Sequence, residues 1–177
     1  MLNLSTLQYP KSKLVILALL ALNAVFFAFV DSLISTADAV VWLLLLLVYE
    51  LESNDVPLPL SAAAMQQLRN LLIAVIVLVF FGYVFTGELL DALNSMLWFA
   101  LVAMLEFEVR WPERASEYEK LFWLATILTF LGLIAMAGLW LWLGDWLDAY
   151  DALLWIAAFG FIEVDIFHFL QRKQSAA

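Results

Sequence analysis

Three pairs of acidic residues recur along this chain at one spacing, and carboxylates repeated in this way can bind cations or exchange protons. Each pair stands eight and ten residues after a tryptophan. The three sets are Trp42 with Glu50 and Glu52, Trp98 with Glu106 and Glu108, and Trp155 with Glu163 and Asp165. Carboxylate oxygens are ligands for hard metal ions, and carboxyl groups inside membranes carry protons in pumps and transporters. The three pairs are therefore the first candidate site.

A polar residue also recurs four positions before each tryptophan, as Asp38, Asn94 and Asp151. The tryptophans are 56 and then 57 residues apart, so the shared pattern is [DN]-x-x-x-W-x7-E-x-[ED] without gaps. A fixed period of this length is typical of tandem structural units. We expect a single transmembrane domain, residues 1–177, built from repeat units at about 13–55, 69–111 and 120–170.

Membrane helices must position these residues, because the composition is that of an integral membrane protein. Hydrophobic residues make up 66% of the chain and the mean hydropathy is +0.98, whereas a soluble domain is roughly half apolar. The chain is long enough for several crossings of ~20 residues each. We expect an all-α integral membrane protein with six transmembrane helices in three tandem hairpins, an arrangement compatible with a pseudo-threefold bundle. The spans are expected at about 14–30, 40–51, 70–85, 94–110, 121–142 and 151–172.

The basic residues predict how these helices are oriented. With six crossings, all eight fall on one side of the membrane: Lys11, Lys13, Arg69, Arg110, Arg114, Lys120, Arg172 and Lys173. Basic loops favour the cytoplasmic side. We therefore expect a multi-pass protein of the cell (inner) membrane with both termini in the cytoplasm. The turns at 31–37, 86–93 and 144–150 then face outward.

The third unit differs from the others in its basic residue. Lys13 and Arg69 lie 29 residues before their tryptophans, whereas Lys120 lies 35 residues before Trp155. This difference predicts an insertion of about six residues near 139–146.

The expected depth of the acidic pairs makes them costly. Each first acid lies twelve residues after Asp38 or its counterpart, which is ~18 Å further along a helix in a hydrocarbon layer ~30 Å thick. An acid inside the bilayer costs roughly 2.5–3.5 kcal/mol, and the C-terminal end of a helix also disfavours negative charge. The placement predicts a positive partner.

Three interpretations of that partner stay open. In the first, Glu50, Glu106 and Glu163 coordinate a cation such as Ca²⁺, Mg²⁺ or Na⁺ or carry protons, while the second acids attract cations at the inner mouth. Those second acids are Glu52, Glu108 and Asp165. In the second interpretation the pairs are structural, and basic side chains neutralise them. In the third, they form a docking surface for a basic helix or a lipid amine.

The other polar groups favour no further chemistry. Asp38, Asn94 and Asp151 are expected either as helix N-caps, which satisfy free backbone N–H groups, or as an outer cation vestibule. His168 is the single histidine and there is no cysteine, so a haem or zinc site is not expected. Within the expected spans the remaining polar residues are few: Asn23, Tyr83, Thr126 and Thr129.

These observations lead to two functional hypotheses. The first is a cation or proton channel or transporter with no cofactor apart from a bound cation. The alternative is a non-catalytic accessory or assembly subunit of a larger membrane complex. The expected partners are the lipid bilayer and other membrane proteins or copies of the same chain. An enzyme is not expected because catalytic motifs are absent, and a net charge of −9 argues against nucleic-acid binding.

Overall fold

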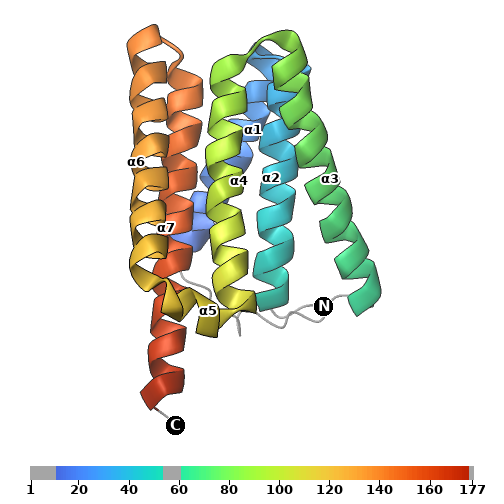
Figure 1. Cartoon of the computed structure of the whole chain (residues 1–177). Coiled ribbons are helices and arrows are strands. Elements are labelled where there is room, and N and C mark those ends of the chain that lie inside the picture. Colours follow the sequence, from blue (N-terminus) through green and yellow to red (C-terminus); the bar gives the residue numbers. More distant parts are fainter. Residues whose placement is uncertain (1–10, 54–60, 176–177) are drawn as a thin grey trace.

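A computed structural model of the protein describes residues 11–53 and 61–175. Nearly all of these residues are helical. Figure 1 shows the helices in chain order. Their bounds are α1 (Lys11–Val30), α2 (Leu33–Ser53), α3 (Ala62–Thr86), α4 (Leu89–Arg110), α5 (Pro112–Glu117), α6 (Glu119–Leu143) and α7 (Trp146–Ser175). No strand occurs within these described ranges. The prediction of an all-helical fold is confirmed.

Four helices in the described ranges are long and apolar enough to cross a membrane. Their apolar stretches are Lys13–Val30, Leu33–Leu51, Ala63–Thr86 and Glu119–Leu143, of 18, 19, 24 and 25 residues. Such lengths match the thickness of a bilayer. The apolar stretch of α4, Leu89–Met104, is shorter. These four helices are consistent with the membrane protein that the composition predicts.

The six long helices pack side by side in a closed ring. In order around it, α1 contacts α2, α2 contacts α3, α3 contacts α4, α4 contacts α6, α6 contacts α7, and α7 returns to α1. The short helix α5 packs between α4 and α6 at one end of the bundle (Figure 1). Around this ring, α2, α4 and α7 alternate with α3, α6 and α1. The helices α2, α4 and α7 each contain one copy of the sequence pattern.

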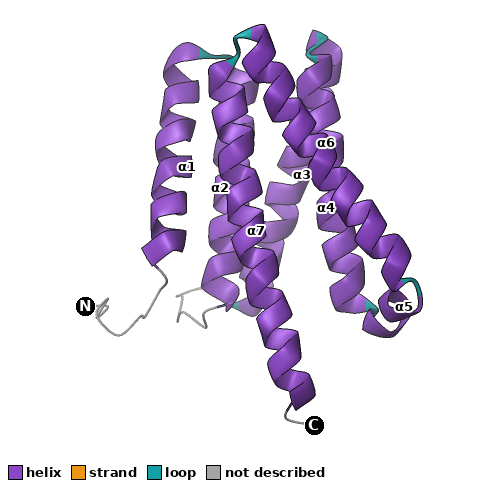
Figure 2. Cartoon of the chain, turned by 90° about the vertical axis from the view of Figure 1, so that its left-hand side faces the viewer, coloured by secondary structure: helices purple, strands orange, loops and turns teal. Residues whose placement is uncertain are grey.

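Three tight turns join the helix pairs at the end opposite α5 (Figure 2). They are two residues long each: Asp31 and Ser32, Gly87 and Glu88, Gly144 and Asp145. Gly87 and Gly144 have φ values of +83° and +93°, a left-handed conformation that glycine adopts at little steric cost. The predicted turns at 31–37, 86–93 and 144–150 are therefore too long.

Backbone hydrogen bonds explain how two residues suffice at the glycine turns. The N–H groups of Gly87 and Glu88 both bond to the carbonyl of Tyr83. The N–H groups of Gly144 and Asp145 bond in the same way to the carbonyl of Trp140. Such paired bonds at a left-handed glycine close a helix end.

The first turn lacks glycine and uses a side chain instead. The Ser32 hydroxyl accepts a hydrogen bond from the Ser35 N–H at 3.1 Å, which is the geometry of a serine N-cap. The α2 helix can therefore start at Leu33, seven residues before the predicted start.

The predicted insertion near residues 139–146 is wrong. The α6–α7 turn is as short as the other two, and α3 and α6 both contain 25 residues. The buried aromatic residues before the three turns, Phe27, Tyr83 and Trp140, are 56 and 57 residues apart, like the tryptophans. Lys120 is simply not the counterpart of Lys13 and Arg69.

Candidate cation site

The repeated polar residues Asp38, Asn94 and Asp151 lie inside α2, α4 and α7, each five residues after the first residue of its helix. The prediction that they are N-caps is therefore wrong, because the short turns start the helices earlier. Trp98 contacts Trp155 across the bundle, and residues four apart share one face of a helix. Asn94 and Asp151 thus occupy the faces that meet in the interior.

Two side chains from other helices hold the carboxylates. The Asn23 amide of α1 donates to Asp151 Oδ1 at 2.7 Å, and the Tyr83 hydroxyl of α3 donates to Asp38 Oδ2 at 3.3 Å. Asn23 and Tyr83 are only 1% and 3% exposed. Asp38 and Asp151 are also close enough to repel each other electrostatically. We call Asn23, Asp38, Tyr83, Asn94 and Asp151 the polar floor.

Two amide oxygens of the polar floor have no hydrogen-bond partner among the described residues. They are Oδ1 of Asn23 and Oδ1 of Asn94, and both atoms are buried. Buried polar atoms are nearly always paired, so an orphan acceptor calls for a water or an ion. The polar floor therefore has an excess of oxygen acceptors over donors.

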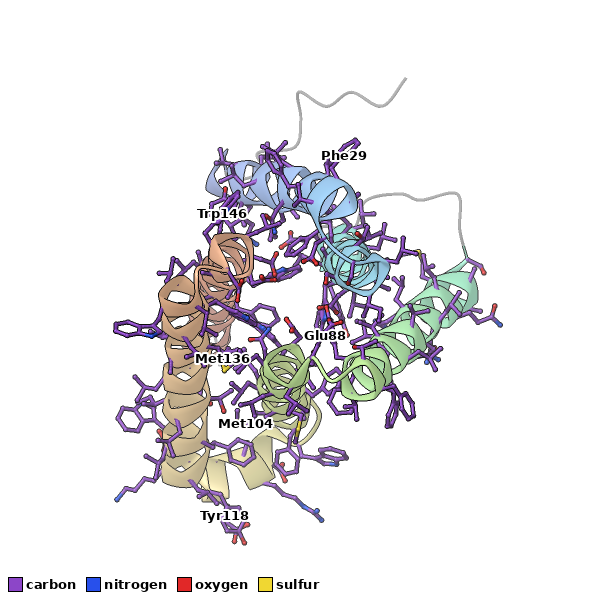
Figure 3. The ribbon with its side chains drawn as sticks, turned by 90° about the horizontal axis from the view of Figure 1, so that it is seen from above. Phe29, Glu88, Met104, Tyr118, Met136 and Trp146 are labelled. Atoms are coloured by element: carbon purple, nitrogen blue, oxygen red, sulfur yellow. The ribbon has the colours of Figure 1, made fainter. Side chains whose placement is uncertain are left out.

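An open pocket of about 430 Å³ lies at the turn end of the bundle. Five of its lining residues are acidic: Asp31, Glu88, Asp91, Asp145 and Asp148. In the view from that end, Glu88 lies at the space between the helices (Figure 3). We call this the outer pocket.

The outer pocket is in register with the polar floor. Three lining residues, Ser35, Asp91 and Asp148, each precede a polar-floor residue of the same helix by three positions. On a helix this spacing places them about one turn nearer the pocket mouth, on the same face. The acids of the pocket thus lead to the partly buried carboxylates of Asp38 and Asp151.

The rim of the outer pocket favours a protonated carboxyl. Asp148 lies in the first turn of α7, outside the apolar stretches. Burial, and then the charges of Asp91, Asp31 and Asp145, raise its pKa to about 7. No three acidic, histidine or cysteine side chains in the described ranges are grouped closely enough to hold a metal ion. The rim therefore attracts cations electrostatically and does not chelate a metal ion.

A layer of tryptophans lies one helical turn beyond the polar floor. The ring centroids of Trp42 and Trp155 are 6.1 Å apart, and those of Trp98 and Trp155 are 6.3 Å apart. The backbones of α2, α4 and α7 make no close contact with one another in the described ranges, so these rings fill the centre. Indole groups of Trp42 and Trp155 also interact with Asp38 and Asp151.

The predicted inner acids are only partly described. Glu50 forms an ion pair with Lys13 at 3.2 Å, joining α2 to α1, and the two side chains are 13% and 19% exposed. This pair agrees with the structural interpretation of that acid. The side chains of the other predicted site residues lie outside the described part of the chain: Glu52, Glu106, Glu108, Glu163 and Asp165, together with His168.

Most of the residues that line the outer pocket were not predicted from the sequence. Its acids fall in segments that the sequence presents as ordinary polar turns, and only their register reveals them. Asp91 and Asp148 stand 57 residues apart, three positions before Asn94 and Asp151. Counting the repeat outward from the tryptophans finds these two residues, although it does not predict that Asn23 and Tyr83 reach the carboxylates.

Comparison of the chain with protein-family models, with curated proteins and with solved structures finds no match to any of them.

Proposed function

We propose that this protein is a small polytopic membrane protein that handles cations or protons, and that they reach it through the outer pocket. One observation carries the proposal. Two carboxylates, Asp38 and Asp151, are partly buried below an acid-lined pocket, and their hydrogen-bond partners Tyr83 and Asn23 are neutral groups. A charge that is partly removed from water is stabilised by an ionic partner or neutralised by a proton.

The charge distribution supports this proposal. The sequence contains no lysine or arginine between residues 14 and 68, 70 and 109, or 121 and 171. The helix segments that form the outer pocket and the polar floor therefore contain no basic residue. Clefts lined by charges of one sign concentrate counter-ions and accelerate their association.

The proposed membrane arrangement has six crossings in three hairpins. The matched turns, the repeated positions five residues into α2, α4 and α7, and the closed ring all favour it. In this arrangement α4 crosses through Leu89–Met104 and its extension to Arg110, and α7 crosses from about Asp151. The basic residues at the opposite end favour cytoplasmic termini, so the outer pocket opens to the other side.

The inner acids have a different part in this proposal. Glu50 with Lys13 stabilises the cytoplasmic end, and the remaining acids of the three pairs attract cations at that mouth. Between the two ends lies the tryptophan layer, which a permeating ion must pass. A rearrangement of these rings is therefore the proposed gate.

The test is cation and proton flux in proteoliposomes that contain the purified full chain. We expect flux driven by an inward gradient, and at least a tenfold reduction in the double variant Asp38→Asn, Asp151→Asn. Glu113→Gln serves as the matched control, because it removes an exposed acid from α5 at the other end. Wild-type flux equal to that of empty vesicles would refute the proposal.

A second candidate function is an accessory subunit of a membrane complex. Large apolar side chains next to the three turns favour it, since Phe29, Phe85 and Trp142 are 82%, 86% and 87% exposed. An exposed apolar ring of this kind suits either a lipid interface or a protein partner. Solubilisation in a mild detergent distinguishes the two functions. Co-migration of the chain with other membrane proteins in fixed stoichiometry would favour the accessory subunit, whereas a chain that migrates alone would count against it.

A further inference from the structure

We infer that the polar floor binds one divalent hard cation of the Ca²⁺ type, held between Asp38 and Asp151. This inference rests on the proposed function and names the ion class of the same site. Its basis is the carboxylate oxygens of Asp38 and Asp151 together with the unpaired amide oxygens of Asn23 and Asn94.

The oxygen set suits such an ion. Asp38 and Asp151 supply carboxylates, and the orphan Oδ1 atoms of Asn23 and Asn94 supply amide oxygens. Ca²⁺ takes six to eight oxygen ligands from carboxylates, amide carbonyls and water. The open outer pocket gives water access to the remaining positions.

The orphan amide oxygens separate this site from a simple acidic cluster. Asn23 is 99% buried, and its Nδ2 is fixed on Asp151 Oδ1 at 2.7 Å. That bond directs the amide into the polar floor, which leaves Oδ1 there without a donor. A bound cation supplies the missing positive partner for both the amide oxygens and the carboxylates.

Charge balance selects a divalent ion. Two carboxylates carry two negative charges, which a doubly charged ion neutralises completely, while a single Na⁺ leaves one negative charge without a counter-ion in a partly buried site. Mg²⁺ demands near-ideal octahedral geometry and gives up water reluctantly. Carboxylates and amides from four different helices, α1, α2, α4 and α7, are better suited to the irregular coordination of Ca²⁺.

The neighbouring groups position the ligands and do not compete for them. The Tyr83 hydroxyl occupies one oxygen of Asp38, Oδ2, and the Asn23 amide occupies one oxygen of Asp151, Oδ1. The indoles of Trp42 and Trp155 also hydrogen-bond to Asp38 and Asp151. Because a carboxylate has about four lone-pair sites, two such donors still leave positions for a cation. The tryptophans lie one turn deeper, which puts two indoles close to the proposed ion.

The experiment titrates the purified full chain in detergent with Ca²⁺ and follows thermal unfolding. We expect millimolar Ca²⁺ to raise the unfolding temperature by about 4 °C, since ligand binding to the folded state stabilises it. Mg²⁺ and Na⁺ at equal ionic strength should produce less than a third of that shift. The variant Asp38→Asn, Asp151→Asn should lose it, and the control Glu113→Gln should keep it.

A second measurement covers variants that fold poorly. Tb³⁺ replaces Ca²⁺ in oxygen sites and luminesces when a nearby indole transfers excitation to it. We expect tryptophan-sensitised Tb³⁺ emission in the wild type, its displacement by Ca²⁺, and at least a fivefold weaker signal in Asn23→Leu. Absence of both the Ca²⁺ shift and the Tb³⁺ signal would overturn the inference.

The outcomes distinguish this inference from the proposed function. Proton or Na⁺ flux without Ca²⁺ binding overturns the ion class and leaves transport in place. Ca²⁺ binding that depends on Asp38 and Asp151, without any flux, supports the site and refutes transport. If Ca²⁺ raises the unfolding temperature of the double variant as much as that of the wild type, Ca²⁺ binds in the outer pocket. That result would overturn the polar floor as the Ca²⁺ site.

Discussion

At the scale of single residues, the polar floor combines costly groups with the donors that hold them. Tyr83 and Asn23 come from α3 and α1, so they join the neighbouring helices to the carboxylates of α2 and α7. Buried hydrogen bonds of this kind fix a unique arrangement as well as adding stability. The sequence predicted which residues repeat, but their role as N-caps was wrong because helix starts depend on turns of two residues.

Removal of the Tyr83 hydroxyl should destabilise the protein. We expect Tyr83→Phe to lower the free energy of unfolding by about 1 kcal/mol, the net value of a typical hydrogen bond, because Asp38 loses a donor. Thermal unfolding in detergent measures this change. The matched control is Tyr118→Phe, at a tyrosine that is 54% exposed, and equal effects of the two substitutions would contradict the assigned role.

Stability should also depend on pH through Asp148. Its pKa is raised from 3.8 to about 7, so the folded state holds this proton more tightly than the unfolded chain does. The stabilising contribution is complete below about pH 4 and disappears as the pH rises through about 7. We expect the unfolding temperature to fall between about pH 4 and pH 7, and Asp148→Asn to flatten that part of the profile. An unchanged profile in the variant would rule out Asp148 as its source.

At the scale of helices, the close approach of α4 and α6 depends on a glycine. A Cβ atom at Gly132 would lie 3.1 Å from Leu97 Cδ2, whereas nothing lies within 4 Å of one at Gly138 in the same helix. A side chain added at Gly132 therefore tests the packing of α4 against α6, and one added at Gly138 tests the helix preference alone.

These glycines make a matched pair of substitutions. We expect Gly138→Ala to stabilise the protein by about 0.5–1 kcal/mol, because alanine favours helices. Gly132→Val should destabilise it by about 1–3 kcal/mol through overpacking against Leu97. Chemical or thermal unfolding in detergent measures both changes, and a Gly132→Val variant as stable as the wild type would show that α4 and α6 are not closely packed there.

The helices also show how far the sequence pattern could predict the fold. Hydropathy was enough for the helical class, and the repeat was enough to place Asp38, Asn94 and Asp151 at equivalent positions. The tertiary contacts were not available from it, because Lys13 meets Glu50 and Asn23 meets Asp151 across 37 and 128 residues of sequence. The acids of the outer pocket were missed for a different reason, because they lie in segments that resemble ordinary polar turns in the sequence.

At the scale of the whole molecule, the two ends of the bundle differ in charge. In the described ranges, the turn end has acids and no basic residue, whereas the other end has all the basic residues together with acids such as Glu50, Glu113 and Glu117. The acids of the outer pocket gather at the turn end, and the basic residues lie near the other end. This asymmetry is the physical basis of the proposed orientation and of cation attraction to one side.

The orientation can be tested directly because the chain has no cysteine. We expect a single cysteine in Asp145→Cys to react with a membrane-impermeant maleimide from outside intact cells. A cysteine in Glu117→Cys, on α5, should react only after the membrane is opened. Labelling of both positions from the same side would contradict the topology.

The most direct test of the central claim is labelling of the Asp38 and Asp151 carboxyl groups in the membrane-embedded protein. A hydrophobic carbodiimide reacts with protonated carboxyl groups that water reaches poorly, and mass spectrometry locates the adduct. We predict modification of Asp38 or Asp151, and at least a fivefold decrease in that modification when a transported cation is present at saturation. Modification of neither residue, or modification that no cation suppresses, would contradict the claim that these carboxylates bind cations.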